Sequence, residues 1–378
     1  MALRELMLIA GLMAVTRSLA TAIRDIGPEL TLTCVVAGAA SYSLVLILVT
    51  VLAMLDGVGV DNWRLIVGFD NPRFFNHVQT VSMPLLAAAI ASASLRPLWR
   101  MLAAVALVLN WTLLVLTLGR ATLLSLALVS FLGAFLMEKR GRQIAFNMLL
   151  AAVAGGLFYW LIFGFLPKVQ GLSTADSVNA YASPSNDHSR FYLWRIALEH
   201  IAEHPWLGIG PMHFAHEPNL KGAHPHNMYL LVAAELGLPA LLLLLVAVFR
   251  AMHSAYKVLQ SNHVGDPPLA LGAWLACVSL LIDAGFSGNL VMPVAQLWVV
   301  LAAALLASSC WPARPPQPMP AVLRHGSVIV AAALLFGLIW LATTTWQDWE
   351  RMSVTSASQP PKDGGGSYRP RFWLDGWF

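Results

Sequence analysis

Histidines are concentrated in one polar stretch of the chain, between two apolar segments. They are His204, His213, His216, His224 and His226. Imidazole suits both metal ligation and proton transfer near neutral pH. A zinc site is disfavoured, because His216-Glu217 does not continue as His-Glu-x-x-His and no carboxylate or cysteine has a familiar ligand spacing. We therefore expect no metal and no cofactor, and we predict that His226, which enters an apolar segment beside Asn227, transfers a proton.

Two arginines have the surroundings of an anion site. Arg120 follows Gly119 inside the apolar run 101–136, which at about 1.5 Å per residue is too long for one membrane crossing. A charge costs several kcal/mol at the bilayer centre, so we place Arg120 at a membrane surface, at the tip of a helical hairpin. Arg190 falls in the first turn of a predicted helix, where free backbone N–H groups assist phosphate binding. The alternative for Arg190 is a side chain that only extends from the interface into water.

Three other charged residues are weaker candidates. Arg73, in DNPRFFNH, could contact a ligand or only anchor a span. Arg195 lies on the same predicted helix as Arg190 but points elsewhere, so it ranks lower. Glu235 is expected to be buried about 13 Å along the helix after His226, on roughly the opposite face. It could act in function or pair with a neighbouring helix.

The elements that position these residues must lie in a membrane. Of the 378 residues, 58% are hydrophobic and 11% are charged, against roughly 25% charged in an ordinary soluble protein. We predict an all-α polytopic membrane protein with about ten transmembrane helices. They are placed near residues 5–23, 30–55, 78–95, 101–136 as two helices, 143–166, 228–249, 269–288, 291–309 and 327–346. The first is either a span or an interfacial helix, because Arg17 interrupts it.

Basic residues between spans predict the orientation. MEKRGR, at 137–142, is the densest basic cluster and is assigned to the cytoplasm by the positive-inside rule. Arg120 and the large loop 167–227 then face the other side. In that loop Phe191, Trp194, Ala197, Leu198 and Ile201 recur at helical spacing and predict an amphipathic helix on the membrane surface. We expect one membrane domain over 1–349, with 167–227 as its catalytic loop, and a Gly/Pro/aromatic tail over 350–378.

Several classes of protein are disfavoured. No basic block resembles a nucleic-acid surface, and Cys34, Cys277 and Cys310 give neither a disulfide framework nor a metal motif. A polytopic transporter is the main rival, since Glu235 and Asp283 could relay protons, but no paired halves with broken helices are visible. A membrane metalloprotease is weakened by the missing zinc motif.

PWLGIGPMHF followed by HPHNMYLLVAAELGLPA resembles the signature of the O-antigen ligase superfamily of bacterial membrane glycosyltransferases. The matching residues are Pro205, Gly208, Gly210, His226, Asn227, Leu230, Glu235 and Gly237. Gly119-Arg120 and Ser189-Arg190 correspond to the family's essential arginines, and His226 to its catalytic histidine. The resemblance covers about residues 70–300, and the N-terminus departs because family members commonly have more spans.

The resemblance implies transfer of a glycan from undecaprenyl diphosphate onto an acceptor hydroxyl, at the periplasmic face of the bacterial inner membrane. Arg120 and Arg190 would stabilise the leaving diphosphate and His226 would orient or deprotonate the hydroxyl, in one inverting, metal-independent step. Residues expected to bind substrate are Arg73, Arg195, Asn227, His224 and Glu235. Besides the donor and membrane lipids, the expected partner is lipid A core or another hydroxyl acceptor, with no nucleic acid.

The acceptor separates three alternatives within this class. Ligases use lipid A core, polymerases extend a second lipid-linked glycan, and protein O-oligosaccharyltransferases modify Ser or Thr. The ligase is favoured, because the chain lacks the large soluble C-terminal domain of many protein-glycosylating relatives.

Overall fold

The computed structural model describes residues 2–58, 66, 69, 71–172, 185–216, 222–261 and 265–311, and within these residues it contains helices and no strand. The α-helices are α1 (Ala2–Ile26), α2 (Pro28–Leu55), α4 (Pro72–Ala91), α5 (Pro97–Thr117), α6 (Arg120–Leu136), α7 (Glu138–Tyr159), α8 (Leu166–Val169), α10 (Ser185–Glu203), α11 (Met228–Gln260), α12 (Pro267–Asp283) and α13 (Pro293–Cys310). A π-helical turn, Trp160–Phe165, joins α7 to α8, and short 3-10 turns occupy Phe214–His216 and Asn289–Val291. The all-α prediction is confirmed.

Seven helices are long and apolar enough to cross a membrane. They are Leu6–Ile26, Pro28–Leu55, Pro72–Ala91, Pro97–Thr117, Glu138–Val169, Met228–Gln260 and Pro293–Cys310, and two shorter apolar helices are Arg120–Leu136 and Pro267–Asp283. These seven and two correspond to nine of the ten predicted spans. The tenth, near 327–346, lies outside the described residues, as does the tail 350–378.

The predicted hairpin within 101–136 is confirmed. Helix α5 ends at Thr117, Leu118 has a left-handed φ of 47°, and α6 begins at Arg120. The basic cluster at 137–142 lies at the junction between α6 and α7. Helix α7 already begins at Glu138, so these cations occupy its first turns, where long side chains reach water without a loop.

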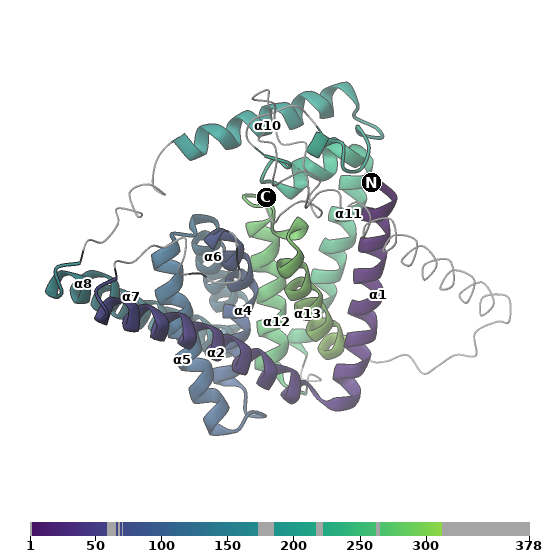
Figure 1. Ribbon diagram of the computed structural model, residues 1–378. Coiled ribbons are helices and arrows are strands. Elements are labelled where there is room, and N and C mark those ends of the chain that lie inside the picture. The colour runs from purple at the N-terminus through teal and green to yellow at the C-terminus, as the bar shows by residue number, and fades with distance from the viewer. Residues whose placement is uncertain are drawn as a thin grey trace, which may run out of the picture.

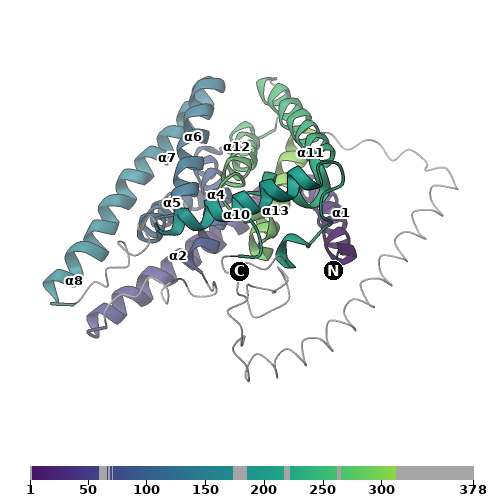
Figure 2. The same ribbon diagram turned by 90° about the horizontal axis from the view of Figure 1, so that it is seen from above.

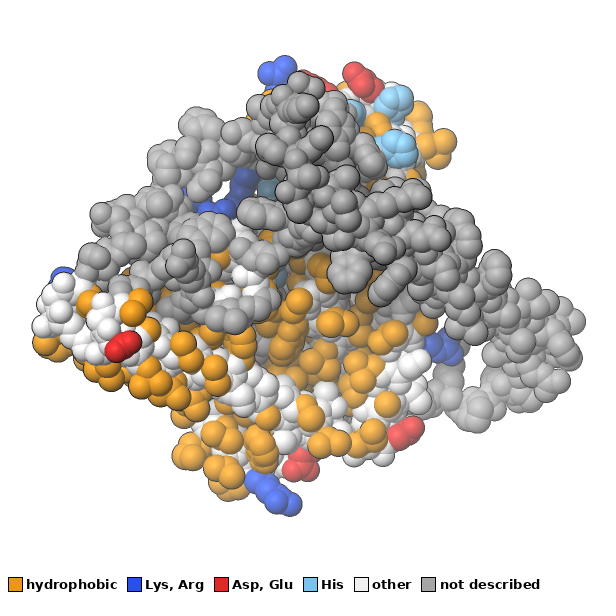
Figure 3. Space-filling model, in the orientation of Figure 1, with side chains coloured by type: hydrophobic (Ala, Val, Ile, Leu, Met, Phe, Trp, Pro, Cys, Tyr) orange, Lys and Arg blue, Asp and Glu red, His pale blue; other side chains and the backbone are white. Residues whose placement is uncertain are grey.

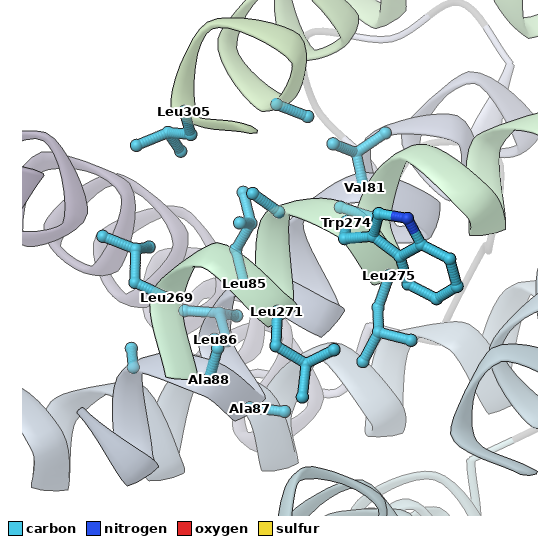
Figure 4. Packing of buried hydrophobic residues seen from close by; sticks show 14 of the residues in the cluster. Val81, Leu85, Leu86, Ala87, Ala88, Leu269, Leu271, Trp274, Leu275 and Leu305 are labelled. Carbon is cyan, nitrogen blue, oxygen red and sulfur yellow. The ribbon is translucent and has the colours of Figure 1, made fainter. Parts of the chain in front are cut away.

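The centre of the bundle is the contact between α4 and α12 (Figure 4). Val81 and Leu85 of α4 and Leu271 and Leu275 of α12 belong to one buried apolar cluster. A Cβ on Gly272 would overlap the Cβ of Ala88, so glycine is required for the close approach of the two helices. Helices α5, α6 and α7 flank this centre on one side and α1, α11 and α13 on the other (Figures 1 and 2).

Helix α4 also carries buried polar side chains near its start. The side-chain amide of Asn76 donates to Gln79 Oε1 at 2.8 Å and to Thr117 Oγ1 at 2.7 Å. Gln79 Nε2 donates to the Asn110 carbonyl at 2.8 Å, and Thr80 shares a hydrogen bond with Thr122 at 2.9 Å. Because lipid offers no hydrogen bonds, these groups must bond to neighbouring helices. They tie α4 to α5 and α6 at one end of the bundle.

Helix α10 crosses this same end (Figures 1 and 2). Its packed face carries Leu193 and Ala197, with Trp194 half-buried and donating from Nε1 to the Pro225 carbonyl at 2.8 Å. Phe191 and Leu198, two residues of the predicted apolar face, are exposed. The helix is rotated so that Arg190, and not Phe191, lines the pocket beside the bundle.

Candidate active site

Three arginines from distant parts of the chain line one pocket at the α10 end. Arg73 comes from the first turn of α4, Arg120 from the start of α6 and Arg190 from α10. The full lining is Arg73, Asn76, His77, Leu118, Gly119, Arg120, Ala121, Thr122, Arg190, Asp283 and Ser287. Figure 3 shows basic and histidine side chains together between α10 and the bundle. Converging guanidinium groups are suited to binding phosphate oxygens.

The α5–α6 turn places Arg120 by packing closely on α4. A Cβ on Gly119 would lie 2.7 Å from Cγ of Asn76, so a larger residue would push the turn away from α4. Asn76 is itself fixed by its bonds to Gln79 and Thr117. In the Gly119-Arg120 pair, the glycine therefore allows the close contact with α4 and the arginine supplies a cation to the pocket.

His226 is held in an unusual backbone conformation just before α11. Its φ is 52°, in the left-handed region, and its N–H donates to Nδ1 of His224 at 3.1 Å. Asn227 caps α11 by accepting from the N–H groups of Tyr229 and Leu230, each at 3.0 Å. The Met228 N–H donates to the Ala284 carbonyl at 2.8 Å. The cap and the neighbouring imidazole thus fix the position of His226.

The surroundings of His226 keep its imidazole neutral. The pKa of His226 is lowered to about 3, first by burial and then by electrostatic repulsion from Arg190, His77 and Arg73, in that order. These interactions relate the histidine to the same cations that line the pocket. A neutral imidazole can accept a proton from a hydroxyl group.

A second polar pair, missed by the sequence analysis, completes the pocket. His77 Nδ1 lies 3.4 Å from Oδ2 of Asp283, which is fully buried. The same carboxylate oxygen accepts from Ser287 Oγ at 2.6 Å and from Asn289 Nδ2 at 2.9 Å. His77 comes four residues after Arg73 and shares its helix face, a signal that could have indicated it. Asp283, which suggested a proton relay in the sequence, is instead part of the pocket wall.

A glycine turn after α10 packs backbone to backbone on α11. Gly208 and Gly237 have φ of 67° and 86°, and a Cβ on Gly208 would overlap the Glu235 carbonyl carbon. The N–H of Gly210 donates to the Glu235 carbonyl at 3.0 Å, and the Glu235 carboxylate accepts from the Phe214 N–H at 3.1 Å. These contacts explain the glycines of the motif physically, since each needs the space and φ that only glycine offers.

Residues 105–245 match a family model described as O-Antigen ligase. This part of the chain is therefore similar to the O-antigen ligase family. The match confirms the resemblance and lies inside the region 70–300 that the motifs indicated, and a search of curated proteins finds no match. It includes Arg120, Arg190, the glycine turn and His226, whereas Arg73, His77 and Asp283 lie outside it.

The structure separates the predicted site residues into groups. Arg73, Arg120 and Arg190 meet at one pocket, with His226 electrostatically coupled to two of them. His224 and Asn227 contact the backbone that positions His226. These six residues form one arrangement.

The other two predicted residues lie elsewhere in the structure. Glu235 is buried and bonds the glycine turn. The Arg195 side chain is 79% exposed and pairs with Glu199 at 2.8 Å, on the outer side of α10. Within the described residues, no group of three or more His, Cys, Asp or Glu side chains could hold a metal ion.

Proposed function

We propose that the protein transfers a glycan from undecaprenyl diphosphate onto an acceptor hydroxyl, with ligation to lipid A core as the favoured reaction. The observation that carries the proposal is the convergence of Arg73, Arg120 and Arg190 on one pocket beside a neutral His226. The superfamily is one of glycosyltransferase-like membrane enzymes, and these side chains supply what such a transfer needs.

The arginines suit a diphosphate leaving group. When the sugar C1–O bond breaks, negative charge grows on the departing phosphate oxygen, and fixed guanidinium donors stabilise that charge. The enclosed space is about 40 Å³, which is room for a few phosphate oxygens and not for a glycan. The sugars and the prenyl chain would extend from the open side of the pocket.

His226 is assigned to the acceptor. Its neutral imidazole would take the proton as the acceptor oxygen bonds to C1 and the C1–O bond to the diphosphate breaks, with inversion at C1. Entry of the diphosphate offsets the positive potential of Arg190 and Arg73, and so raises the pKa of His226 toward the range of an effective base. Donor binding would thereby prepare the base for the acceptor.

The α10 end would face the periplasm of a bacterial inner membrane. Lys139, Arg140 and Arg142 lie at the opposite end of the bundle, and the positive-inside rule assigns that end to the cytoplasm. A polymerase and a protein O-oligosaccharyltransferase would use the same donor pocket. The transporter alternative is weakened by the contacts of the two buried carboxylates. Glu235 accepts from the glycine turn, and Asp283 lies 3.4 Å from His77 Nδ1 and accepts from Ser287 and Asn289.

Reconstitution tests this proposal. The purified protein is placed in liposomes with undecaprenyl-diphosphate oligosaccharide and EDTA, with and without lipid A core, and compared with His226→Ala. Transfer to lipid A core that is lost in the variant supports the ligase. Longer lipid-linked chains without lipid A core indicate a polymerase, and absence of transfer to any hydroxyl acceptor, including a peptide with Ser or Thr, contradicts the proposal.

A further inference from the structure

Two apolar side chains project from the glycine turn after α10. Trp206 is 75% exposed and Leu207 is 84% exposed, the largest fraction for any bulky hydrophobic residue in the described part of the chain. Adjacent exposed apolar side chains on a loop tip are unfavourable in water. They indicate a surface that meets an apolar partner.

The backbone beneath these side chains is held tightly, so their exposure does not reflect a loose loop. Leu238 N–H donates to the Pro205 carbonyl at 2.8 Å, and Ile209 N–H donates to the Ala234 carbonyl at 2.9 Å. A Cβ on Gly237 would overlap the Trp206 carbonyl oxygen. The tip is thus attached to α11 on both sides of Trp206 and Leu207.

The point of attachment is a break in α11. Gly237 has φ 86° and ψ 165°, and Pro239 follows it. Before the break Leu231, Ala234 and Glu235 are buried. After it the exposed apolar residues are Leu238, Leu242, Leu243, Leu244, Leu245, Val246 and Phe249. The lipid-facing surface of α11 therefore begins at the level of the tip.

The apolar length of α11 agrees with contact between the tip and the bilayer. From Leu238 to Phe249 the apolar part of the helix rises roughly 18 Å at 1.5 Å per residue, less than a hydrocarbon core about 30 Å thick, and Arg250 follows. The bilayer surface on the α10 side therefore lies no lower than the level of Gly237, where Trp206 and Leu207 project. Tryptophan is enriched at this depth because its ring is apolar and its N–H can bond to water or head groups.

We propose that Trp206 and Leu207 form an interfacial anchor, which inserts into the head-group region of the bilayer on the α10 side. The anchor continues the lipid-facing surface of α11 and fixes the depth in the bilayer of the chain segment that follows α10. A further consequence rests on the proposed function: the anchor holds Arg190 at the depth where the diphosphate of a lipid-linked donor is presented.

Depth measurement tests the anchor without any activity assay. Cysteines carrying the environment-sensitive fluorophore NBD are placed singly at three sites in a background with Cys34, Cys277 and Cys310 replaced by alanine, after its melting temperature has been checked. Leu207→Cys probes the anchor, Glu203→Cys marks the water side at the end of α10, and Leu242→Cys marks the hydrocarbon. Lipids with a nitroxide quencher at the head group or deep in the acyl chain report depth in liposomes.

We expect head-group quenching at position 207 and weak quenching at position 203, with deep quenching at position 242. A probe at position 207 that is quenched as weakly as the probe at 203 overturns the anchor. The anchor is also overturned if the probe at 207 is shielded from water only when lipid A core is added. The latter result would assign the two side chains to the acceptor instead.

A second variant tests the consequence for catalysis. Trp206→Ser/Leu207→Ser removes the apolar tip but keeps the backbone contacts, so the melting temperature should remain near wild type. We expect KM for the lipid-linked donor to rise about 3- to 10-fold at unchanged kcat, and Trp206→Phe/Leu207→Ile to restore the wild-type KM. An unchanged KM in the serine variant contradicts the role in donor presentation. If the enzyme transfers no glycan at all, the proposed function fails while the depth measurement still decides the anchor.

Discussion

The two ends of the bundle are both basic, yet only one has the features of an active site. At the α10 end Arg73, Arg120 and Arg190 meet around a space of about 40 Å³. At the other end Lys139 and Arg140, both exposed, border a cavity of about 380 Å³.

The difference lies in what faces the cations. The smaller pocket contains His77, buried Asp283 and a polar wall from α4. The larger one is bordered by Glu138, by Gln260 and by apolar side chains such as Leu259, and its lining cations come from α7 alone. Neither the size of a cavity nor its number of charges therefore identifies the active site. The active site is identified by cations from three helices that converge on fixed polar partners.

The sharpest test of the comparison exchanges one histidine at each end. His226→Asn should lower kcat by about 10²- to 10⁴-fold, because it removes the proton acceptor. Asparagine tolerates the left-handed φ of this position, so the fold should be kept. Glycan transfer is measured in liposomes together with the melting temperature.

His253→Asn is the matched control for this test. His253 is exposed on α11 and stacks on Phe249, well after the break in the helix. Transfer by this variant should stay close to wild type. Equal losses in the two variants would contradict the assignment of chemistry to the α10 end.

Removing single positive charges should give the next largest difference in kcat between the two ends of the bundle. Arg120→Gln or Arg190→Gln should lower kcat by about 10²- to 10³-fold, since each removes a donor to the developing phosphate charge. Arg140→Gln and Arg142→Gln remove the same charge at the opposite end and should leave kcat nearly unchanged. If all four variants lose activity alike, the net charge of the protein and not the pocket controls the reaction.

Two glycines test whether the close backbone contact after α10 contributes to the stability of the fold. Gly208→Ala forces a Cβ against the Glu235 backbone at a left-handed φ and should cost about 1–3 kcal/mol of unfolding free energy. Gly156 lies inside α7, and a Cβ added there would meet no other atom within 4 Å, so Gly156→Ala should be neutral or stabilising by about 0.5–1 kcal/mol. Denaturation in detergent measures both, and a Gly208→Ala protein as stable as wild type would refute the close backbone contact.

The buried histidine also predicts that stability depends on pH. The folded pKa of His226 is about 3, below the value near 6.5 of an unfolded histidine. As pH falls from about 6.5 toward 3, the unfolded state gains a proton that the folded state does not, so stability is lost across this window. The melting temperature of the wild type should therefore fall more steeply with acid than that of His226→Asn. Parallel curves would show that His226 is not held neutral.

Much of the fold follows from the sequence because the bilayer sets the length of each helix. This is why the hairpin at Gly119 and the helices up to α13 could be placed. The face of α10 could not, because periodicity shows which residues share a face and not which face packs.

The site was predictable where motifs or span ends marked it, as for Arg120, Arg190 and His226. His77 and Asp283 were not, since they lie in α4 and α12 and meet only through the packing of those helices. Glu235 shows the same limit. Its distance along the helix from His226 could be estimated, but its bond to the Phe214 N–H depends on the folded loop.

Helix α4 bears on how the chain enters the membrane during synthesis. It is the least apolar of the seven candidate spans, and Asn76, Gln79 and Thr80 are polar groups that a lipid-exposed helix would leave without partners. Those partners belong to α5 and α6, which are synthesised later. We therefore expect α4 to be retained by the insertion machinery until its neighbours emerge, so that the wall of the active site forms only when the three helices enter the bilayer together.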